Sequence, residues 1–175
     1  MAIKTIFLDR DGVINKEINY LYKIKDFEFI DGVFESCIFF QDLNYKIIII
    51  SNQSGIARGF FNEADYHTLT KWMIKEFKIR GISILDTYYC PHFPESSCNC
   101  RKPRPGMITK AIDKNNIDPL MSWMIGDKET DIEAANLAGI ENTILVRSGH
   151  SINEANSNAK FIVDSMKHSI NLIKI

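Results

Sequence analysis

The chain has 175 residues, of which 45% are hydrophobic and 25% charged, and its formal net charge is −1. These values are typical of a globular protein, and we expect residues 1–175 to form a single domain. The near-neutral charge argues against a nucleic-acid partner, and no apolar run is long enough to span a membrane. Charged residues at Lys4, Asp9 and Arg10 interrupt the first apolar stretch, so we expect no secretory signal and a cytoplasmic location.

Strand-like and helix-like segments alternate along the first part of the chain. The expected elements, in chain order, are a strand over 3–8, a loop with at most a short strand pair over 15–29, a helix over 32–43 and a strand over 46–50. Asp31 is the predicted cap of that helix, and Asn44 is predicted to end it in the left-handed conformation. The β-branched run before Ser51 is typical of a central parallel strand buried on both faces.

The alternation continues to the end of the chain. The expected elements are a helix over 63–80, a strand over 82–89, a loop over 90–106, a helix over 107–115, a strand over 122–125, a helix over 129–138, strands over 142–146 and 161–163, and a helix over 165–173. Asn62 is the predicted cap of the first of these helices, and residues 149–160 are expected to form a loop or a weak helix. This alternation predicts an α/β fold with a doubly wound parallel sheet.

Polar side chains follow three of the predicted strands. They are Asp9 and Asp11 after the first strand, Ser51 and Asn52 after the second, and Asp127 and Asp131 after the fourth. Each group alone also suits a turn or a helix cap. Ligands of parallel sheets bind beyond the carboxyl ends of the strands, clustered carboxylates favour a divalent cation, and a carboxylate can attack phosphorus. Together the three loops therefore predict a site for phosphoryl chemistry.

The ordered motifs resemble those of the haloacid dehalogenase (HAD) superfamily of phosphohydrolases. The matching segments are residues 9–13, Ser51-Asn52, Lys102 and residues 126–131. The resemblance implies a Rossmann-like core and Mg²⁺-dependent hydrolysis through an aspartyl phosphate. The implied roles are Asp9 as nucleophile, Asp11 as acid and base, Ser51, Asn52 and Lys102 as phosphate-binding groups, and the Asp9 carboxylate, the Asp11 carbonyl and the Asp127 carboxylate as Mg²⁺ ligands.

Residues 90–100 contain a second candidate metal site, with the pattern Cys-x-His-x5-Cys-x-Cys. Its ligands would be Cys90, His92, Cys98 and Cys100. Three thiolates and one imidazole suit a structural Zn²⁺ with no open coordination position. A disulfide is the alternative, although a Cys98–Cys100 bridge would close a strained ring. Because this loop leads directly to Lys102, zinc would also position that lysine.

The zinc loop and the motifs together resemble one branch of the superfamily, the heptose bisphosphate phosphatases and the related histidinol-phosphatases. Residues 9–15, 51–59 and 101–107 look more like the heptose enzymes, whereas the five residues between His92 and Cys98 are a spacing similar to that of histidinol-phosphatases. The resemblance implies a small phosphorylated sugar, best a heptose 1,7-bisphosphate that loses its 7-phosphate for surface polysaccharide synthesis, with histidinol phosphate as the alternative. The implied substrate contacts are Glu17, Ile18, Asn19, Tyr20, Gln53, Ser54, Arg101 and Lys128.

No insertion is large enough for a cap domain, so residues 15–29 and the zinc loop would enclose the site, and we expect a monomer. A non-catalytic zinc-binding scaffold and a polynucleotide end-phosphatase are further alternatives. The presence of both Asp9 and Asp11 argues against the first, and the near-neutral charge argues against the second. The expected structural residues are Cys37 and Trp123 in the core, and His67, His150 and His168 at the surface.

Overall fold

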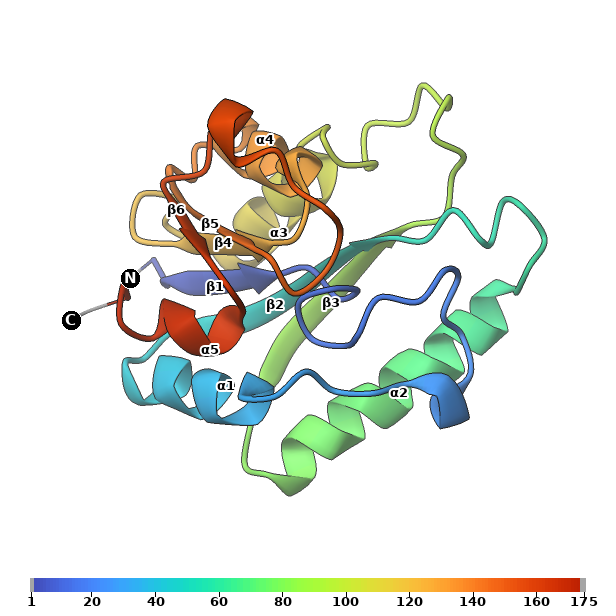
Figure 1. Ribbon diagram of the computed structural model, residues 1–175, viewed down its shortest axis with the longest axis horizontal. Helices are drawn as coiled ribbons and strands as arrows, with labels where there is room; N and C mark the ends of the chain where they lie inside the picture. Colours follow the sequence, from blue (N-terminus) through green and yellow to red (C-terminus); the bar gives the residue numbers. More distant parts are fainter. Residues whose placement is uncertain (1, 174–175) are drawn as a thin grey trace.

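Figure 1 shows the computed structural model, which describes residues 2–173. The strands form a six-stranded parallel sheet in the order β3-β2-β1-β4-β5-β6. Their bounds are β1 Thr5–Leu8, β2 Lys46–Asn52, β3 Ile84–Cys90, β4 Trp123–Gly126, β5 Asn142–Val146 and β6 Phe161–Val163. The strand order reverses between β1 and β4, which confirms the predicted doubly wound sheet.

Helices cover both faces of this sheet. Their bounds are α1 Val33–Asp42, α2 Glu63–Ile79, α3 Gly106–Asn115, α4 Glu129–Leu137 and α5 Met166–Ser169. Figure 1 shows α1, α2 and α5 on one face and α3 and α4 on the other. No helix of residues 2–173 combines the length and the apolar character needed to cross a membrane.

Alternate residues of the central strands point into two different apolar layers. Ile6 and Leu8 of β1 pack in the layer that contains α1 and α2, whereas Phe7 packs in the layer that contains α3 and α4. All three side chains are fully buried. Each such side chain stabilises the fold by roughly 1.5–3 kcal/mol. Burial on both faces explains why these strands are continuous apolar runs in the sequence.

The predicted helix ends are partly correct. Asn62 caps α2 through a capping box, and Asn44 follows α1 with a φ of 64°. The prediction for Asp31 is wrong, because Gly32, with a φ of 80°, occupies the cap position of α1. Asp31 instead pairs with Lys167, whose Nζ lies 3.0 Å from Asp31 Oδ2.

The C-terminal helix is shorter than the predicted span of residues 165–173. Residues 174 and 175 lie outside the described residues, and α5 ends at Ser169. The N–H groups of Leu172 and Ile173 both donate to the Ser169 carbonyl oxygen, and Ile173 is fully buried. The chain therefore turns inward at this point, and the side chain of Ile173 enters the core.

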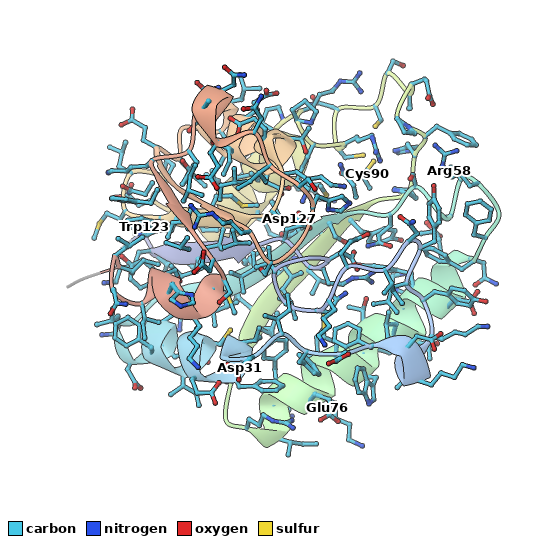
Figure 2. The ribbon with its side chains drawn as sticks, in the orientation of Figure 1. Asp31, Arg58, Glu76, Cys90, Trp123 and Asp127 are labelled. Atoms are coloured by element: carbon cyan, nitrogen blue, oxygen red, sulfur yellow. The ribbon has the colours of Figure 1, made fainter. Side chains whose placement is uncertain are left out.

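The strand register brings the predicted site loops to one edge of the sheet. Leu8 is the register partner of both Ile49 and Ile125, so the residues that follow β1, β2 and β4 leave the sheet at similar levels. Asn52 of β2 pairs with Cys90 of β3, which places the start of the zinc loop beside the end of β2. In Figure 2, the Asp127 and Cys90 side chains lie toward this edge, and Trp123 lies toward the opposite one.

Candidate active site

A cavity of about 370 Å³ lies at the carboxyl edge of the sheet. Its walls come from the loops that follow β1, β2, β4 and β5 and from the end of the zinc loop. The lining residues are Asp9–Asp11, Glu17–Leu21, Asn52–Gly55, Arg101, Lys102, Asp127, Lys128, Thr130, Asp131 and His150. Because the strand order reverses between β1 and β4, this is the place where a parallel sheet of this kind binds ligands.

The predicted catalytic, phosphate-binding and substrate-binding residues line this cavity, with one exception. Ser51 is 1% exposed and lies outside the cavity lining. Its hydroxyl oxygen accepts a hydrogen bond of 3.3 Å from Gln53 Nε2. The predicted contact between the Ser51 side chain and a phosphate therefore remains a prediction.

The Asp9 carboxylate is held through one of its two oxygens. Asp9 Oδ1 lies 3.0 Å from Lys102 Nζ and accepts a 2.8 Å hydrogen bond from the Arg10 N–H. Burial and the nearby charge of Asp131 raise the pKa of Asp9 well above its ordinary value, although the Lys102 charge opposes them. Ionised Asp9 therefore needs additional positive charge nearby, and both of these contacts are made by Oδ1 rather than Oδ2.

Lys102 is the buried cation at the base of the cavity. Its Nζ lies 2.6 Å from Asp131 Oδ1 and donates to the Ile50 carbonyl oxygen at 3.1 Å. Burial lowers the pKa of Lys102, but the Asp131 and Asp9 charges outweigh burial and raise it overall. The Asn52 side chain makes two hydrogen bonds of 3.1 Å with the Lys102 backbone. Asn52, predicted to bind phosphate, therefore anchors the residue that carries this cation.

Asp131 has a role that the sequence reading did not assign. Its Oδ2 accepts hydrogen bonds from the N–H groups of Asp127 and Lys128, at 3.1 and 3.0 Å, in the first turn of α4. Its Oδ1 is the partner of Lys102. An aspartate at the third position of a helix is a capping signal. The sequence therefore predicts that Asp131 accepts from N–H groups at the start of α4, but it does not predict the contact with Lys102.

Asp11 is surrounded by hydrogen-bond donors. Arg10 Nε and Nη2 donate to its two oxygens at 3.1 and 2.9 Å, and the Asn15 and Gln53 side chains add bonds of 3.0 and 3.1 Å. Burial raises the pKa of Asp11, but the Arg10 charge and these bonds outweigh it, so the net pKa is lowered. Arg10 is 2% exposed and also donates to the Leu21 carbonyl oxygen at 3.1 Å. The sequence reading missed this buried guanidinium.

The side chain of His150, expected at the surface, is 34% exposed and also lines the cavity. Its Nδ1 lies 2.6 Å from Asp127 Oδ2, and its backbone N–H donates to the same oxygen at 2.9 Å. The contact arises because β5 is the neighbour of β4, which brings the loop after β5 across the end of β4. The two residues are 23 positions apart, so no local spacing could have revealed the contact.

The carboxylates at the centre of the cavity fit a divalent cation. Carboxylate oxygens of Asp9, Asp127 and Asp131 lie within 4.8 Å of one another. Asp131 is committed to Lys102 and to the start of α4. Asp127 Oδ1 is buried and has no hydrogen-bond partner among residues 2–173. Asp9 and Asp127 thus offer the hard oxygen ligands that Mg²⁺ prefers.

The four predicted zinc ligands converge. His92 Nδ1 lies 3.4 Å from Cys90 Sγ and 3.3 Å from Cys100 Sγ, and the Sγ atoms of Cys90 and Cys98 are 3.7 Å apart. All four cysteines of the chain are free thiols. Tetrahedral Zn–S bonds of about 2.3 Å place neighbouring sulfurs about 3.7 Å apart, so the cluster has the size of a zinc site. The Cys90 and Cys98 sulfurs are farther apart than the roughly 2.03–2.05 Å of a disulfide bond.

The rim of the cavity is formed by loops, and a large cap domain is absent from residues 2–173. Within residues 15–29, Glu17–Leu21 form one wall, and the base of this segment is joined by a bridge between Asn15 and Phe29 and by a 2.9 Å hydrogen bond from the Lys16 N–H to the Glu28 carbonyl oxygen. The exposed ring of Tyr20 packs against Phe60, with ring centroids 4.5 Å apart. Arg101 and Lys128, both predicted substrate contacts, add two cations to the lining, and cations of this kind bind phosphate oxygens.

Comparisons with known proteins agree with this geometry. A family model described as HAD-hydrolase-like matches residues 99–169. The D-glycero-alpha-D-manno-heptose-1,7-bisphosphate 7-phosphatase of Photorhabdus laumondii is 48% identical over 164 residues, which cover 90% of each chain. The D-glycero-beta-D-manno-heptose-1,7-bisphosphate 7-phosphatase of Escherichia coli K12 is 42% identical over 173 residues, or 94% of this chain and 91% of the relative.

The solved structures include a similar chain. The D,D-heptose 1.7-bisphosphate phosphatase from B. bronchiseptica, complexed with magnesium and phosphate, superposes with a TM-score of 0.84 at 26% sequence identity. The superposition covers 97% of each chain. The whole described fold is therefore shared with that structure.

Proposed function

The chain belongs to the family of heptose-1,7-bisphosphate 7-phosphatases within the HAD-like hydrolases, and from this premise we propose that it removes the 7-phosphate of D-glycero-D-manno-heptose 1,7-bisphosphate. The observation that carries the proposal is the 42–48% identity to these phosphatases over at least 90% of the chain. The lining of the cavity supports it, since Asp9, Asp11 and Lys102 lie at its base and Arg101 and Lys128 are available for a second phosphate.

The geometry supports a two-step hydrolysis. Asp9 Oδ2 attacks phosphorus, the bond from phosphorus to the sugar oxygen breaks, and Asp11 gives a proton to the leaving oxygen. Asp11 then takes a proton from the water that hydrolyses the aspartyl phosphate. Because its surroundings lower the pKa of Asp11, the negative charge of an incoming phosphate is needed to protonate it for the first step.

The cofactors of the proposed reaction are Mg²⁺ and Zn²⁺. The Asp9 and Asp127 carboxylates and the Asp11 carbonyl would hold Mg²⁺, which lowers the repulsion between an anionic nucleophile and a phosphate. Cys90, His92, Cys98 and Cys100 would hold a structural Zn²⁺. Lys102 supplies a fixed positive charge from the protein itself.

The biological setting is part of the proposal. We propose that residues 1–175 act as one phosphatase domain, because the described strands form one sheet and the cavity lies at its edge, and that the protein acts as a monomer. A cytoplasmic role in making activated heptose for lipopolysaccharide is consistent with the substrate named for the relatives.

Substrate comparison tests this proposal. We expect kcat/KM for heptose 1,7-bisphosphate to exceed that for histidinol phosphate by about 100-fold or more, because two charge-assisted contacts to a second phosphate contribute roughly 3 kcal/mol or more. Both anomers of the bisphosphate should be measured, since the relatives are named for one or the other. A preference for histidinol phosphate would reject the heptose proposal.

The Asp9→Asn variant tests the proposed nucleophile. We expect phosphate release to fall by about 10³-fold or more, because the amide cannot form the covalent intermediate. Zinc content and the melting temperature serve as controls, and neither should decrease, since the variant only removes a charge that burial disfavours. Unchanged activity would exclude Asp9 as the nucleophile, and absence of activity in the parent protein would favour a zinc-binding scaffold.

A further inference from the structure

The loop that follows β5 is built closely around Asp127. Ser148 Oγ donates a 2.7 Å hydrogen bond to the Gly12 carbonyl oxygen, which ties this loop to the loop after β1. A Cβ atom on Gly149 would lie 2.7 Å from Asp127 Cβ, so only glycine allows the backbone to approach this closely. The next residue, His150, then meets the Asp127 carboxylate with its backbone and its ring.

The hydrogen bonds from His150 divide the two carboxylate oxygens of Asp127 into different roles. A carboxylate only accepts, so His150 Nδ1 carries the hydrogen in the 2.6 Å contact with Oδ2. The backbone N–H of His150 donates to that oxygen as well. Oδ1 is buried and has no hydrogen-bond partner among the residues that the structure describes. One oxygen is therefore fixed by two donors, and the other is left for a cation.

We propose that His150 is a positioning residue of the magnesium site, which acts through the hydrogen bond from its Nδ1 to Asp127 Oδ2 and so orients Oδ1 toward the metal. This inference rests on the proposed Mg²⁺-dependent function. Donors to a metal-binding carboxylate fix its orientation, and their loss typically weakens metal binding by about 10- to 100-fold. The backbone N–H remains in any variant, so we expect the ring to contribute an effect near the lower limit.

Two other roles for the His150 ring are conceivable, and they make different predictions. Its Nε2 lies 3.7 Å from Glu17 Oε1, on the side of the predicted substrate contacts, so the ring could bind substrate. It could also merely hold the loop in place. Its side chain is 34% exposed, so substitution there should leave the core intact.

A pair of amide variants separates these roles. Asparagine places its amide nitrogen near the position of Nδ1, and glutamine places its amide nitrogen near that of Nε2. His150→Asn therefore keeps the donor to Asp127, whereas His150→Gln and His150→Ala lose it. His168→Ala is the matched control, because His168 is an exposed histidine of α5 outside the cavity lining.

The experiment is calorimetric titration of the zinc-loaded enzyme with Mg²⁺ alone, followed by kcat and KM at saturating Mg²⁺. We expect the Kd for Mg²⁺ to rise about tenfold in His150→Ala and His150→Gln. In His150→Asn and His168→Ala it should stay within about twofold of the parent value. At saturating Mg²⁺, the KM for the sugar phosphate should be unchanged in His150→Ala.

Several results would overturn the inference. If His150→Ala binds Mg²⁺ like the parent, or if His150→Asn binds it no better than His150→Ala, the ring does not position Asp127. A raised KM with unchanged Mg²⁺ affinity would make His150 a substrate contact instead. If the parent enzyme hydrolyses the sugar phosphate but binds no Mg²⁺, the proposed metal site fails together with this inference. If it binds Mg²⁺ but hydrolyses neither substrate, only the proposed substrate fails.

Discussion

At the scale of single residues, the site depends on charges that the fold holds away from water. Lys102 and Asp131 are buried and paired, and Asp9 is 7% exposed beside them. Removing one partner of such a pair leaves an uncompensated charge, which is more costly than the net value of the pair. Loss of Lys102 or Asp131 should therefore destabilise the fold, whereas loss of the Asp9 charge should not, because Lys102 keeps Asp131 as its partner and the ionised form of Asp9 is disfavoured.

Ionisation of Glu17 should make the stability of the folded protein depend on pH. Burial, and to a smaller extent the Asp11 and Asp127 charges, raise the pKa of Glu17, whereas the His150 and Lys128 charges lower it. The net result is a pKa of about 7. Below the ordinary value of 4.5 Glu17 is neutral in both the folded and the unfolded chain. Between that value and about 7 the unfolded chain ionises first, so the stability of the parent protein falls as pH rises.

We therefore expect Glu17→Gln to raise the melting temperature relative to the parent protein, and to do so more at pH 8 than at pH 5. The measurement is thermal unfolding in Mg²⁺-free buffer. Glu133→Gln is the matched control, because Glu133 is exposed on α4 and solvent reaches its carboxylate in both states. The same difference in melting temperature at the two pH values would contradict the raised pKa of Glu17.

At the scale of elements, the loop with the four proposed zinc ligands connects the end of β3 to Lys102, the proposed phosphate-binding lysine. Residues 91–105 contain no helix or strand, so they bury little apolar surface. Arg104 Nη1 donates to the Ser96 carbonyl oxygen at 2.6 Å and also to the Cys98 carbonyl oxygen. These bonds, together with the zinc ion that we propose for the four ligands, would order this loop and so determine the position of Lys102.

Cys100→Ser should therefore release zinc and impair catalysis without unfolding the sheet. We expect the loss of about one zinc ion per chain and a fall in kcat/KM of about 10-fold or more, since metal-dependent positioning is lost. Metal analysis and far-UV circular dichroism are the measurements. Cys37→Ala is the control: Cys37 is buried in α1, so its variant should be less stable yet keep its zinc. Retention of zinc by Cys100→Ser would exclude it as a ligand.

At the scale of the whole molecule, the buried apolar residues that stabilise the fold and the residues that line the cavity lie in different regions. The apolar layer under α1, α2 and α5 includes Val33, Cys37 and Met166, and none of these residues lines the cavity. The site residues instead follow the carboxyl ends of the strands. Loops line much of the cavity, and we expect them to select the substrate.

Met166→Ala tests this separation. Met166 is fully buried, and its truncation should destabilise the protein by about 2–5 kcal/mol, because a cavity remains in the layer beside α1. Urea unfolding measures that cost. At a temperature where the variant is still folded, kcat/KM should match that of the parent protein. A large loss of activity in the folded variant would show that α5 influences the site.

Much of this protein follows from its sequence alone. The apolar runs and the alternation of strands and helices predicted a doubly wound parallel sheet. Strands that are buried on both faces have apolar side chains on both, so they appear in the sequence as continuous apolar runs. The ordered motifs determined the superfamily, and the Cys-x-His-x5-Cys-x-Cys pattern determined which four atoms could meet. In each case the relevant residues are close in sequence or occur in a recognisable order.

Only the tertiary structure decided how the loops meet. The ring of His150 on Asp127, the pairing of Lys102 with Asp131 and the burial of Arg10 beside Asp11 all depend on how the site loops pack. The first two contacts join segments that lie far apart in the chain, and the number of residues between such segments does not predict whether they meet in space. The sheet brings these segments together: β4 and β5 are parallel neighbours, and the pairing of β3 with β2 and of β1 with β4 brings the loop that carries Lys102 to the same edge.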